Sequence, residues 1–183
     1  TPAGLAPMQV IVGDVHPLDF VLPEVEGFQR YAKAICWLDV ATNRIWFSVV
    51  VLPKGQGVRN EHVIASFIEM ATAWGLPHSL YLDNGSEYNW AAFIEDALQL
   101  RADRARVIIH AKPYSARSKP IEGIFGQLER HHFANLPGWI GGDRMKSKTA
   151  NVGRAPTPFP GDHRLFVQAI DCAVELYHSL PQP

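Results

Sequence analysis

Apolar and polar residues follow two different periods along this chain, and the two periods separate predicted strands from predicted helices. Short apolar runs bounded by turn residues predict five strands, over residues 8–14, 34–40, 44–52, 79–83 and 106–110. The short turn Ala41-Thr-Asn43 connects the second run to the third, so these two strands are predicted to form an antiparallel hairpin.

Apolar residues at helical spacing predict helices from Asn60 to about residue 74, over residues 89–100, from about 118 to 133, and over 164–178. The first has Asn60 as its N-cap and ends before Gly75 and Pro77. Its predicted buried residues are Val63, Ile64, Phe67, Ile68, Ala71 and Trp74. The last helix is expected to bury Phe166, Ala169, Ile170, Ala173, Val174 and Tyr177.

The order of these elements predicts the fold class. Three strands come first, and helices then alternate with strands before a terminal helix. This order indicates an α/β protein with a mixed five-stranded sheet flanked by helices on both faces, and a ribonuclease H-like fold has the same order. The length of 183 residues suits a single domain over residues 1–183. Residues 135–161 are rich in Gly and Pro, carry no apolar period, and are predicted to form a flexible loop.

Composition narrows the class of protein. Apolar residues make up 47% of the chain, which is typical of a globular protein, and no apolar run is long enough to cross a membrane. Cys36 and Cys172 lie in apolar stretches, so we expect buried free thiols rather than a disulfide. The net charge of −1 is not typical of a DNA-binding protein. The chain begins at Thr1 without an initiator Met, so we expect it to be a fragment of a larger protein.

Three acidic residues in three separate places are the strongest candidates for chemistry. Asp14 follows the apolar run of residues 8–13, Asp83 follows Leu80-Tyr-Leu82, and Glu122 lies near the start of a predicted helix. Two carboxylates from strand ends and one from a helix can converge and hold divalent metal ions. Such a cluster supports phosphoryl transfer on nucleic acid.

Each aspartate has an alternative interpretation. Asp83 begins Asp83-Asn-Gly-Ser-Glu87, and Asn-Gly is also a turn signal, although a helical pattern follows it rather than a partner strand. Asp19 and Asp39 compete with Asp14. Asp19 lies in a stretch broken by prolines, and Asp39 precedes a turn, where a capping Asp is common.

Helical geometry favours Glu122 over the nearby Glu129. Glu122 lies about 100° from Ile121, so it flanks the predicted buried stripe and can reach over the sheet edge. That stripe consists of Ile121, Ile124, Phe125 and Leu128. Glu129 is about 10 Å further along the helix and is interpreted as a solvated or salt-bridged surface charge. An acidic residue that only complements the helix dipole is the alternative for Glu122.

Basic residues near Glu122 and in the predicted loop form a candidate DNA path. They are Lys112, Arg117, Lys119, Arg130, Arg144, Lys146, Lys148 and Arg154. Together they can neutralise several phosphates without reading base sequence. The histidines lack the Cys/His spacing of a structural zinc site.

These residues resemble the catalytic domain of DDE transposases and retroviral-type integrases, and most of all the bacteriophage Mu transposase core. The resemblance rests on Gly13-Asp14, on Asp83-Asn84 followed by Asn89-Trp90, and on Lys119-Pro-Ile-Glu-Gly-Ile-Phe-Gly126, and it covers roughly residues 8–178. Glu122 follows Asp83 by 39 positions (122 − 83), close to the superfamily's habitual separation but shorter than in the Mu protein. A Gly also follows Glu122 here, which is a second departure from the Mu pattern.

The resemblance implies an enzyme that cuts DNA at transposon ends and joins them to target DNA. Asp14, Asp83 and Glu122 would be the catalytic residues and would hold two Mg²⁺ or Mn²⁺ ions. It further implies DNA as partner, a homo-oligomer assembled on DNA through parts beyond this fragment, no membrane partner, and a bacterial cytoplasm. A ribonuclease H-like nuclease without strand transfer and an inactive scaffold of a nucleoprotein complex are the alternatives.

Overall fold

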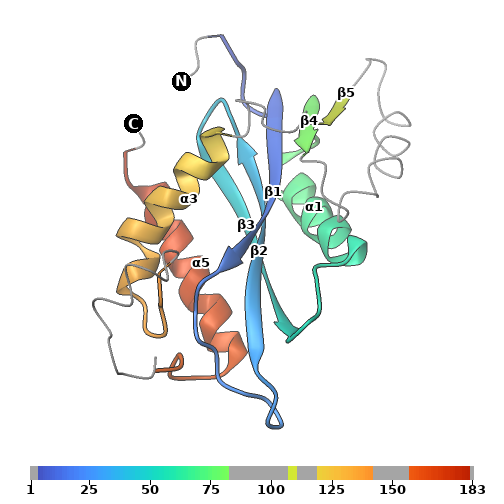
Figure 1. Cartoon of the computed structure of the whole chain (residues 1–183). Helices are drawn as coiled ribbons and strands as arrows, with labels where there is room; N and C mark the ends of the chain where they lie inside the picture. The colour runs from blue at the N-terminus through green and yellow to red at the C-terminus, as the bar shows by residue number, and fades with distance from the viewer. Residues whose placement is uncertain (1–3, 83–106, 111–118, 142–156, 182–183) are drawn as a thin grey trace. The chain divides into compact units, whose positions relative to one another are not determined.

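A computed structural model describes residues 4–82, 107–110, 119–141 and 157–181 (Figure 1). In chain order its elements are β1 (Val10–Leu18), β2 (Arg30–Asp39), β3 (Arg44–Pro53), α1 (Asn60–Trp74), β4 (Ser79–Leu82), β5 (Val107–His110), α3 (Lys119–His131), a 3-10 helix (Phe133–Asn135) and α5 (His163–Ser179). The predicted helix over residues 89–100 lies outside the described residues.

The strands form one sheet in the order β3-β2-β1-β4-β5. β1, β4 and β5 pair in parallel, whereas a turn after Asp39 connects β2 directly to β3 as an antiparallel hairpin (Figure 1). Parallel and antiparallel pairs therefore share one sheet, and the prediction of a mixed α/β fold is confirmed.

β1 is longer than the sequence pattern predicted. The first strand was predicted over residues 8–14, yet it continues past His16 and Pro17 to Leu18. Pro17 lacks an N–H, but its fixed φ is compatible with extended backbone, so it does not end the strand here. As a consequence Asp14 lies in the middle of β1 and not at its end.

Residue contacts divide the chain into two compact units. The first unit comprises residues 1–15, 35–48 and 58–123, and in it α1 packs on the β2–β3 hairpin. The Trp37 ring lies edge-on to Phe67, with 5.3 Å between the ring centroids. The Trp37 Nε1–H donates to Ser66 Oγ at 2.9 Å, and the Ser66 hydroxyl donates to Ser48 Oγ at 2.8 Å.

The buried face of α1 differs from the predicted one. Val63 and Phe67 are buried as expected, but Ile68 is 55% exposed and Met70 is fully buried. Ser66 is buried as well, because its hydroxyl is the partner of the Trp37 indole, a contact that an apolar period does not reveal. The N-cap is Arg59 and not Asn60, and the His62 side chain accepts a hydrogen bond from the Arg59 N–H.

The second unit comprises residues 16–34, 49–57 and 124–183, and its core is aromatic. The ring of Phe20 lies edge-on to Phe133, Trp139 and Phe166 at centroid distances of 6.3, 5.1 and 5.1 Å. Of the predicted face of α5, all but the half-buried Ala169 are buried. That helix begins with Asp162, whose Oδ1 accepts a hydrogen bond from the Leu165 N–H at 2.8 Å.

The segment predicted as a flexible loop over residues 135–161 is anchored at both ends. The Val21 N–H donates to the Gly138 carbonyl at 2.8 Å, and the Phe159 N–H donates to the Val21 carbonyl at 2.8 Å. Gly138 has a φ of +81°, and a Cβ there would lie 2.9 Å from the Phe159 nitrogen, so a glycine is required at this crossing. Residues 142–156, between the two anchors, lie outside the described part of the chain.

Among the helices described, none combines the length and the apolar composition needed to cross a lipid bilayer.

Candidate active site

Asp14 is half-buried on β1, the central strand of the sheet. Its Oδ1 accepts a hydrogen bond from the Val15 N–H at 2.8 Å. Cys36, on the neighbouring strand β2, is fully buried, and burial together with the negative charge of Asp14 raises the pKa of the Cys36 thiol well above its ordinary value. The carboxylate therefore lies close enough to a buried, neutral thiol to affect its ionisation.

Gly13, directly before Asp14, allows an unusually close approach of three elements. A Cβ at this position would lie 2.7 Å from Cζ3 of Trp37 and 2.8 Å from Cδ2 of Leu82, closer than real Cβ atoms come to other heavy atoms. Trp37 and Leu82 are both fully buried. The Trp37 ring from β2 and the Leu82 side chain from β4 therefore both contact β1 at the place that a side chain of residue 13 would occupy.

The register of β1 and β4 aligns two of the three predicted acids in the sequence. Gly13 is paired with Leu82, so Asp14 and Asp83 are the residues that follow the same parallel pair. Asp83 itself lies outside the described residues. Within the described part of the chain, no group of three or more His, Cys, Asp or Glu side chains could hold a metal ion.

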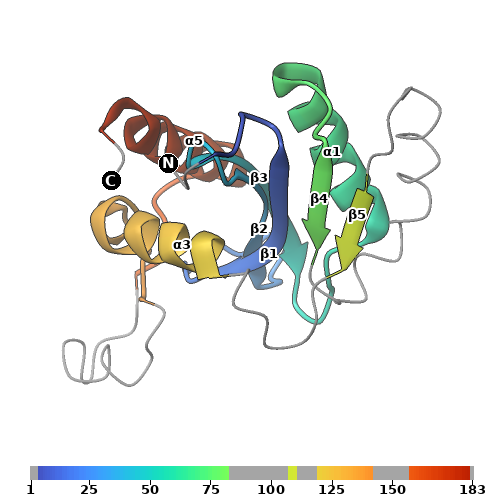
Figure 2. The same cartoon turned by 90° about the horizontal axis from the view of Figure 1, so that it is seen from above.

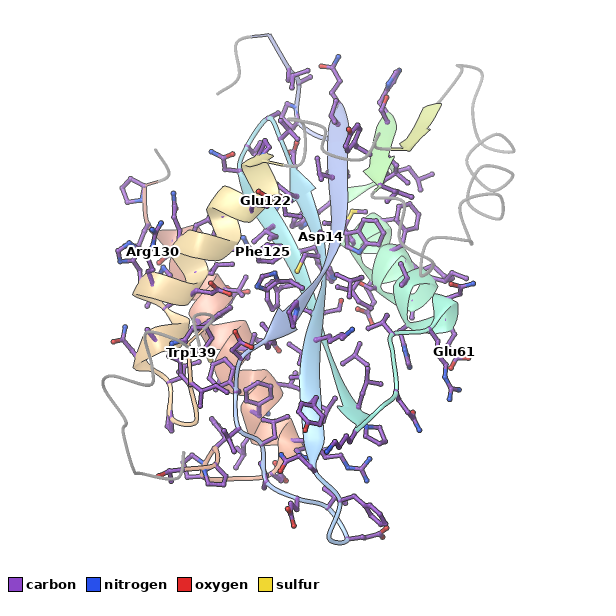
Figure 3. All side chains as sticks on the ribbon, viewed as in Figure 1. Asp14, Glu61, Glu122, Phe125, Arg130 and Trp139 are labelled. Atoms are coloured by element: carbon purple, nitrogen blue, oxygen red, sulfur yellow. The ribbon has the colours of Figure 1, made fainter. Side chains whose placement is uncertain are left out.

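Glu122 is exposed in the first turn of α3, as the helical spacing predicted. The predicted buried stripe on α3 is confirmed, since Ile121, Ile124, Phe125 and Leu128 are each at most 5% exposed. Figure 3 shows Glu122 at the N-terminal end of α3, Phe125 on the side of this helix towards β1, and Arg130 on the other side.

His16 connects β1 to α3, and sequence reasoning missed it. Its ring stacks on Phe125, with 4.1 Å between centroids and 14° between planes. Its Nε2 lies 2.8 Å from Glu129 Oε1, and the two side chains are only 26% and 24% exposed. Of the two interpretations of Glu129 from the sequence, solvated or salt-bridged, the structure therefore shows the salt-bridged one. The spacing of two between Asp14 and His16, on one strand face, was the available signal.

Asp39, the strongest rival of Asp14, has a structural role. It is 3% exposed, and its carboxylate accepts hydrogen bonds from the Ala41 N–H at 3.1 Å and the Thr42 hydroxyl at 2.8 Å. The Met8 N–H is a third donor, at 3.3 Å. Asp39 thus caps the β2–β3 turn and has little capacity left for a metal ion. Asp19 follows the end of β1 and its carbonyl pairs with the Ile140 N–H.

Most of the predicted DNA-binding residues lie outside the described part of the chain. These are Lys112, Arg117, Arg144, Lys146, Lys148 and Arg154. Arg130 is exposed on α3, and its guanidinium lies 3.6 Å from the position that a Cβ on Gly126 would take. Lys119 is the first residue of the same helix.

The donor set suits a hard divalent cation. Carboxylate oxygens are the ligands that Mg²⁺ and Mn²⁺ prefer, and a site for either ion needs exposed oxygen atoms on a rigid support. Asp14 on the central strand and Glu122 at the start of a well-packed helix satisfy this requirement. Figures 1 and 2 both show α3 beside β1, and Figure 1 shows the two elements running in the same direction.

Comparison with known proteins gives structural matches only. No protein-family model matches the sequence, and no curated protein matches it. The HTLV-2 integrase catalytic core domain in complex with magnesium matches in a dimeric and a trimeric form, each with a TM-score of 0.55 and 16% identity. The matches cover 97% of this chain and 91% and 90% of those chains.

A chain of the simian T-cell lymphotropic virus intasome matches with a TM-score of 0.55 and 18% identity, over 98% of this chain and 51% of that one. At these identities the likeness shows the fold alone, which is the ribonuclease H-like fold of integrase catalytic cores. The matches agree with the predicted fold and give no specific support to the finer resemblance to phage Mu transposase.

Proposed function

We propose that this chain is the catalytic core of a DDE-type transposase, a polynucleotidyl transferase that cleaves transposon DNA ends and joins them to target DNA in a bacterial host. Asp14, Asp83 and Glu122 are its catalytic carboxylates. The proposal is supported by the integrase-type fold and by the local geometry around Asp14.

The register between β1 and β4 carries the proposal. Consecutive Cα atoms are about 3.8 Å apart, and neighbouring strands are about 4.8 Å apart. Asp83 is bonded to Leu82, which is paired with Gly13, so the chain itself tethers Asp83 near Asp14. Close packing at Gly13 holds that pair rigidly, and a two-carboxylate site needs such support.

The three carboxylates bind two Mg²⁺ or Mn²⁺ ions, which supply activation of the attacking water or DNA 3′-hydroxyl and stabilisation of the leaving oxygen in an in-line displacement. Asp14 would supply oxygens from β1 and Glu122 from α3, and Asp83 follows the last residue of β4 in the sequence. The HTLV-2 integrase cores were solved with magnesium, which supports a divalent metal in this fold.

DNA approaches this site along the basic residues that precede and follow Glu122. Arg130 is exposed on α3. The remaining members are Lys112, Arg117, Lys119, Arg144, Lys146 and Lys148. Dimeric and trimeric forms of the HTLV-2 core and the viral intasome support a homo-oligomer assembled on DNA.

Cleavage and joining of a labelled DNA end by the complete protein, together with Mn²⁺ binding, test the proposal. We expect Asp14→Asn, Asp83→Asn and Glu122→Gln each to abolish Mn²⁺ binding and both reactions while the protein stays folded. The matched controls are Asp19→Asn for the aspartates and Glu61→Gln for Glu122, since Glu61 also lies in the first turn of a helix; both should retain activity.

Each other outcome identifies an alternative. Metal-dependent cleavage without joining would identify a nuclease, and a folded protein that binds no Mn²⁺ at millimolar concentration would identify a scaffold. Loss of activity in Asp19→Asn but not in Asp14→Asn would show that the wrong aspartate was assigned.

A further inference from the structure

His16 on β1 makes two contacts with α3. The ring of His16 stacks on Phe125, which is 3% exposed, and its Nε2 donates to Glu129 Oε1 at 2.8 Å. A carboxylate only accepts, so the shared hydrogen belongs to the imidazole. The stack resists separation of the two elements, and the directional hydrogen bond resists sliding of one along the other.

The pair is better shielded from water than an ordinary surface ion pair. The His16 and Glu129 side chains are 26% and 24% exposed, whereas those of the α1 pair Arg59–Glu61 are 64% and 67% exposed and 3.6 Å apart. Exposed pairs contribute little to stability, because solvent screens them and ordering their side chains costs entropy. The His16–Glu129 contact is shorter and drier, so it restrains its partners more strongly.

The same strand and the same helix carry the proposed metal ligands. Asp14 lies two residues before His16, hence on the same strand face and about 6.7 Å away along β1. Glu122 lies two helical turns before Glu129, about 10 Å away on the same side of α3. Because both elements run in the same direction, both steps lead towards the same end of the β1–α3 contact (Figure 1).

We infer that the His16–Glu129 pair, with the His16–Phe125 stack, is a positioning device that fixes the register of α3 on β1 and so the separation of the Asp14 and Glu122 carboxylates. This inference rests on the proposed function of these two acids. His16 and Glu129 are positioning residues, since they act through the elements and do not touch the metal ions or DNA. Removing a group that is hydrogen-bonded to a metal ligand typically lowers metal affinity or activity about 10- to 100-fold, and a restraint that acts one step further away is expected at the lower end of that range.

The decisive comparison is Glu129→Ala with Glu129→Gln in the complete protein. Glu129→Ala removes the acceptor, and we expect about 10-fold weaker Mn²⁺ binding and a similar fall in kcat, with KM for DNA unchanged. Glu129→Gln keeps an acceptor oxygen and should restore both quantities to within about 2-fold of wild type, an effect that loss of charge alone would not give. Glu61→Ala, which removes the glutamate of the exposed α1 pair, should change neither.

A second pair of variants tests the contacts from the strand side. His16→Gln retains a donor without the ring, and His16→Phe retains a ring without the donor. If both contacts set the register, each variant should bind Mn²⁺ more weakly than wild type. This pair also decides the question if Glu129→Ala does not fold.

Three results would overturn the inference. Unchanged Mn²⁺ affinity and kcat in Glu129→Ala, with only the free energy of unfolding lowered, would mean that the pair is purely structural. Equal inactivation by Glu129→Ala and Glu129→Gln would mean that Glu129 itself binds metal or DNA. Wild-type affinity in both His16 variants would exclude His16 as the restraint. Failure of the proposed function is distinguishable, because wild-type protein would then bind no Mn²⁺ before any variant is compared.

Discussion

Two glycines, Gly13 and Gly138, allow close contacts that any side chain at these positions would prevent. The missing side chain of Gly13 lets the Trp37 ring and Leu82 approach the backbone of β1, and a missing side chain at Gly138 lets Phe159 and Val21 meet. In both places the local sequence looks unremarkable, because a glycine in a strand or loop has many possible causes. Only the neighbours from distant parts of the chain show why no larger residue is accommodated.

Gly13→Ala should lower the free energy of unfolding by about 1–3 kcal/mol, because the added methyl group would lie 2.7 Å from Trp37 and 2.8 Å from Leu82. Urea denaturation measures the change. The control is Gly123→Ala in α3, where nothing lies within 4 Å of the added Cβ, and it should be neutral or stabilising by about 0.5–1 kcal/mol. Equal stability of Gly13→Ala and wild type would mean that β1 and β4 are not closely packed at this pair.

His132 should make stability depend on pH. It is 9% exposed, and its Nδ1 has no hydrogen-bond partner among the residues that the structure describes. Burial, with a smaller contribution from the charge of His131, lowers the pKa of His132 below 6.5. Between the two pKa values His132 is protonated in the unfolded chain and neutral in the folded chain. The free energy of unfolding therefore has its full value above about pH 6.5 and decreases as the pH falls towards the pKa of the folded state.

His132→Phe keeps a ring against Tyr177, 6.0 Å away between centroids, and removes this titration. Denaturation at pH 5.5 and 7.5 should show a smaller loss of stability on acidification than in wild type. His131→Phe, the exposed neighbour, is the control and should keep most of the wild-type dependence. An unaltered pH dependence in His132→Phe would contradict the assignment.

At the scale of elements, buried residues were predicted best in helices whose apolar residues repeat at helical spacing and pack on one face. The stripe from Ile121 to Leu128 on α3 and the apolar face of α5 were predicted from spacing alone. β1 was predicted too short, since Pro17 is a turn signal that an extended strand can also contain. Ile68 on α1 was placed inside for its apolar character, whereas Ser66 is inside because Trp37 needs an acceptor there.

In the candidate site, too, residues with an informative local sequence were predicted, whereas contacts between distant residues were not. Asp14 and Glu122 were predicted from their neighbours in the sequence, and the turn-capping contacts of Asp39 remove its main competitor. The spacing from Asp14 indicates which strand face carries His16, but its contacts with Phe125 and Glu129 could not be predicted, because these residues lie more than a hundred positions away in the sequence. The periodicity of a sequence describes one helix or strand at a time, so it does not predict how two elements are aligned on each other.

Ser66→Ala should weaken the docking of α1 on the β2–β3 hairpin. It leaves the buried Trp37 Nε1–H without its acceptor at 2.9 Å, which costs about 1–3 kcal/mol of stability in chemical denaturation. The control Ser48→Ala removes the hydroxyl that accepts from Ser66. Ser48 is only half-buried, so water can replace its hydroxyl and the loss of stability should be smaller. A larger effect of Ser48→Ala than of Ser66→Ala would contradict this explanation.

On the scale of the whole molecule, the net charge is close to zero while the positive charge is concentrated in one segment of the sequence. The net charge is −1, so the chain as a whole does not attract DNA, and any affinity must come from local basic groups. Residues 142–156 contain Arg144, Lys146, Lys148 and Arg154 against Asp143 alone. We therefore expect this segment to supply a large part of the phosphate contacts.

Arg144→Gln, Lys146→Gln and Lys148→Gln together should weaken binding to unrelated DNA sequences alike and lower the slope of log K against log salt by as much as about 2.7, at about 0.9 per phosphate contact. Fluorescence anisotropy of the complete protein over a salt series measures both. Lys54→Gln with Arg59→Gln, which removes two exposed charges elsewhere, is the control. An unchanged slope in the triple variant would exclude the segment from the DNA path.

The hydrogen bonds of Val21 to Gly138 and Phe159 have an evolutionary consequence. The Val21 N–H donates to Gly138 and the Val21 carbonyl accepts from Phe159, so the two ends of the segment that contains residues 142–156 are held at one residue. Doubling the length of such a stretch costs only about 0.6 kcal/mol in closure entropy. We therefore expect relatives of this protein to differ more in the length and sequence of residues 142–156 than in β1, β4 and α3.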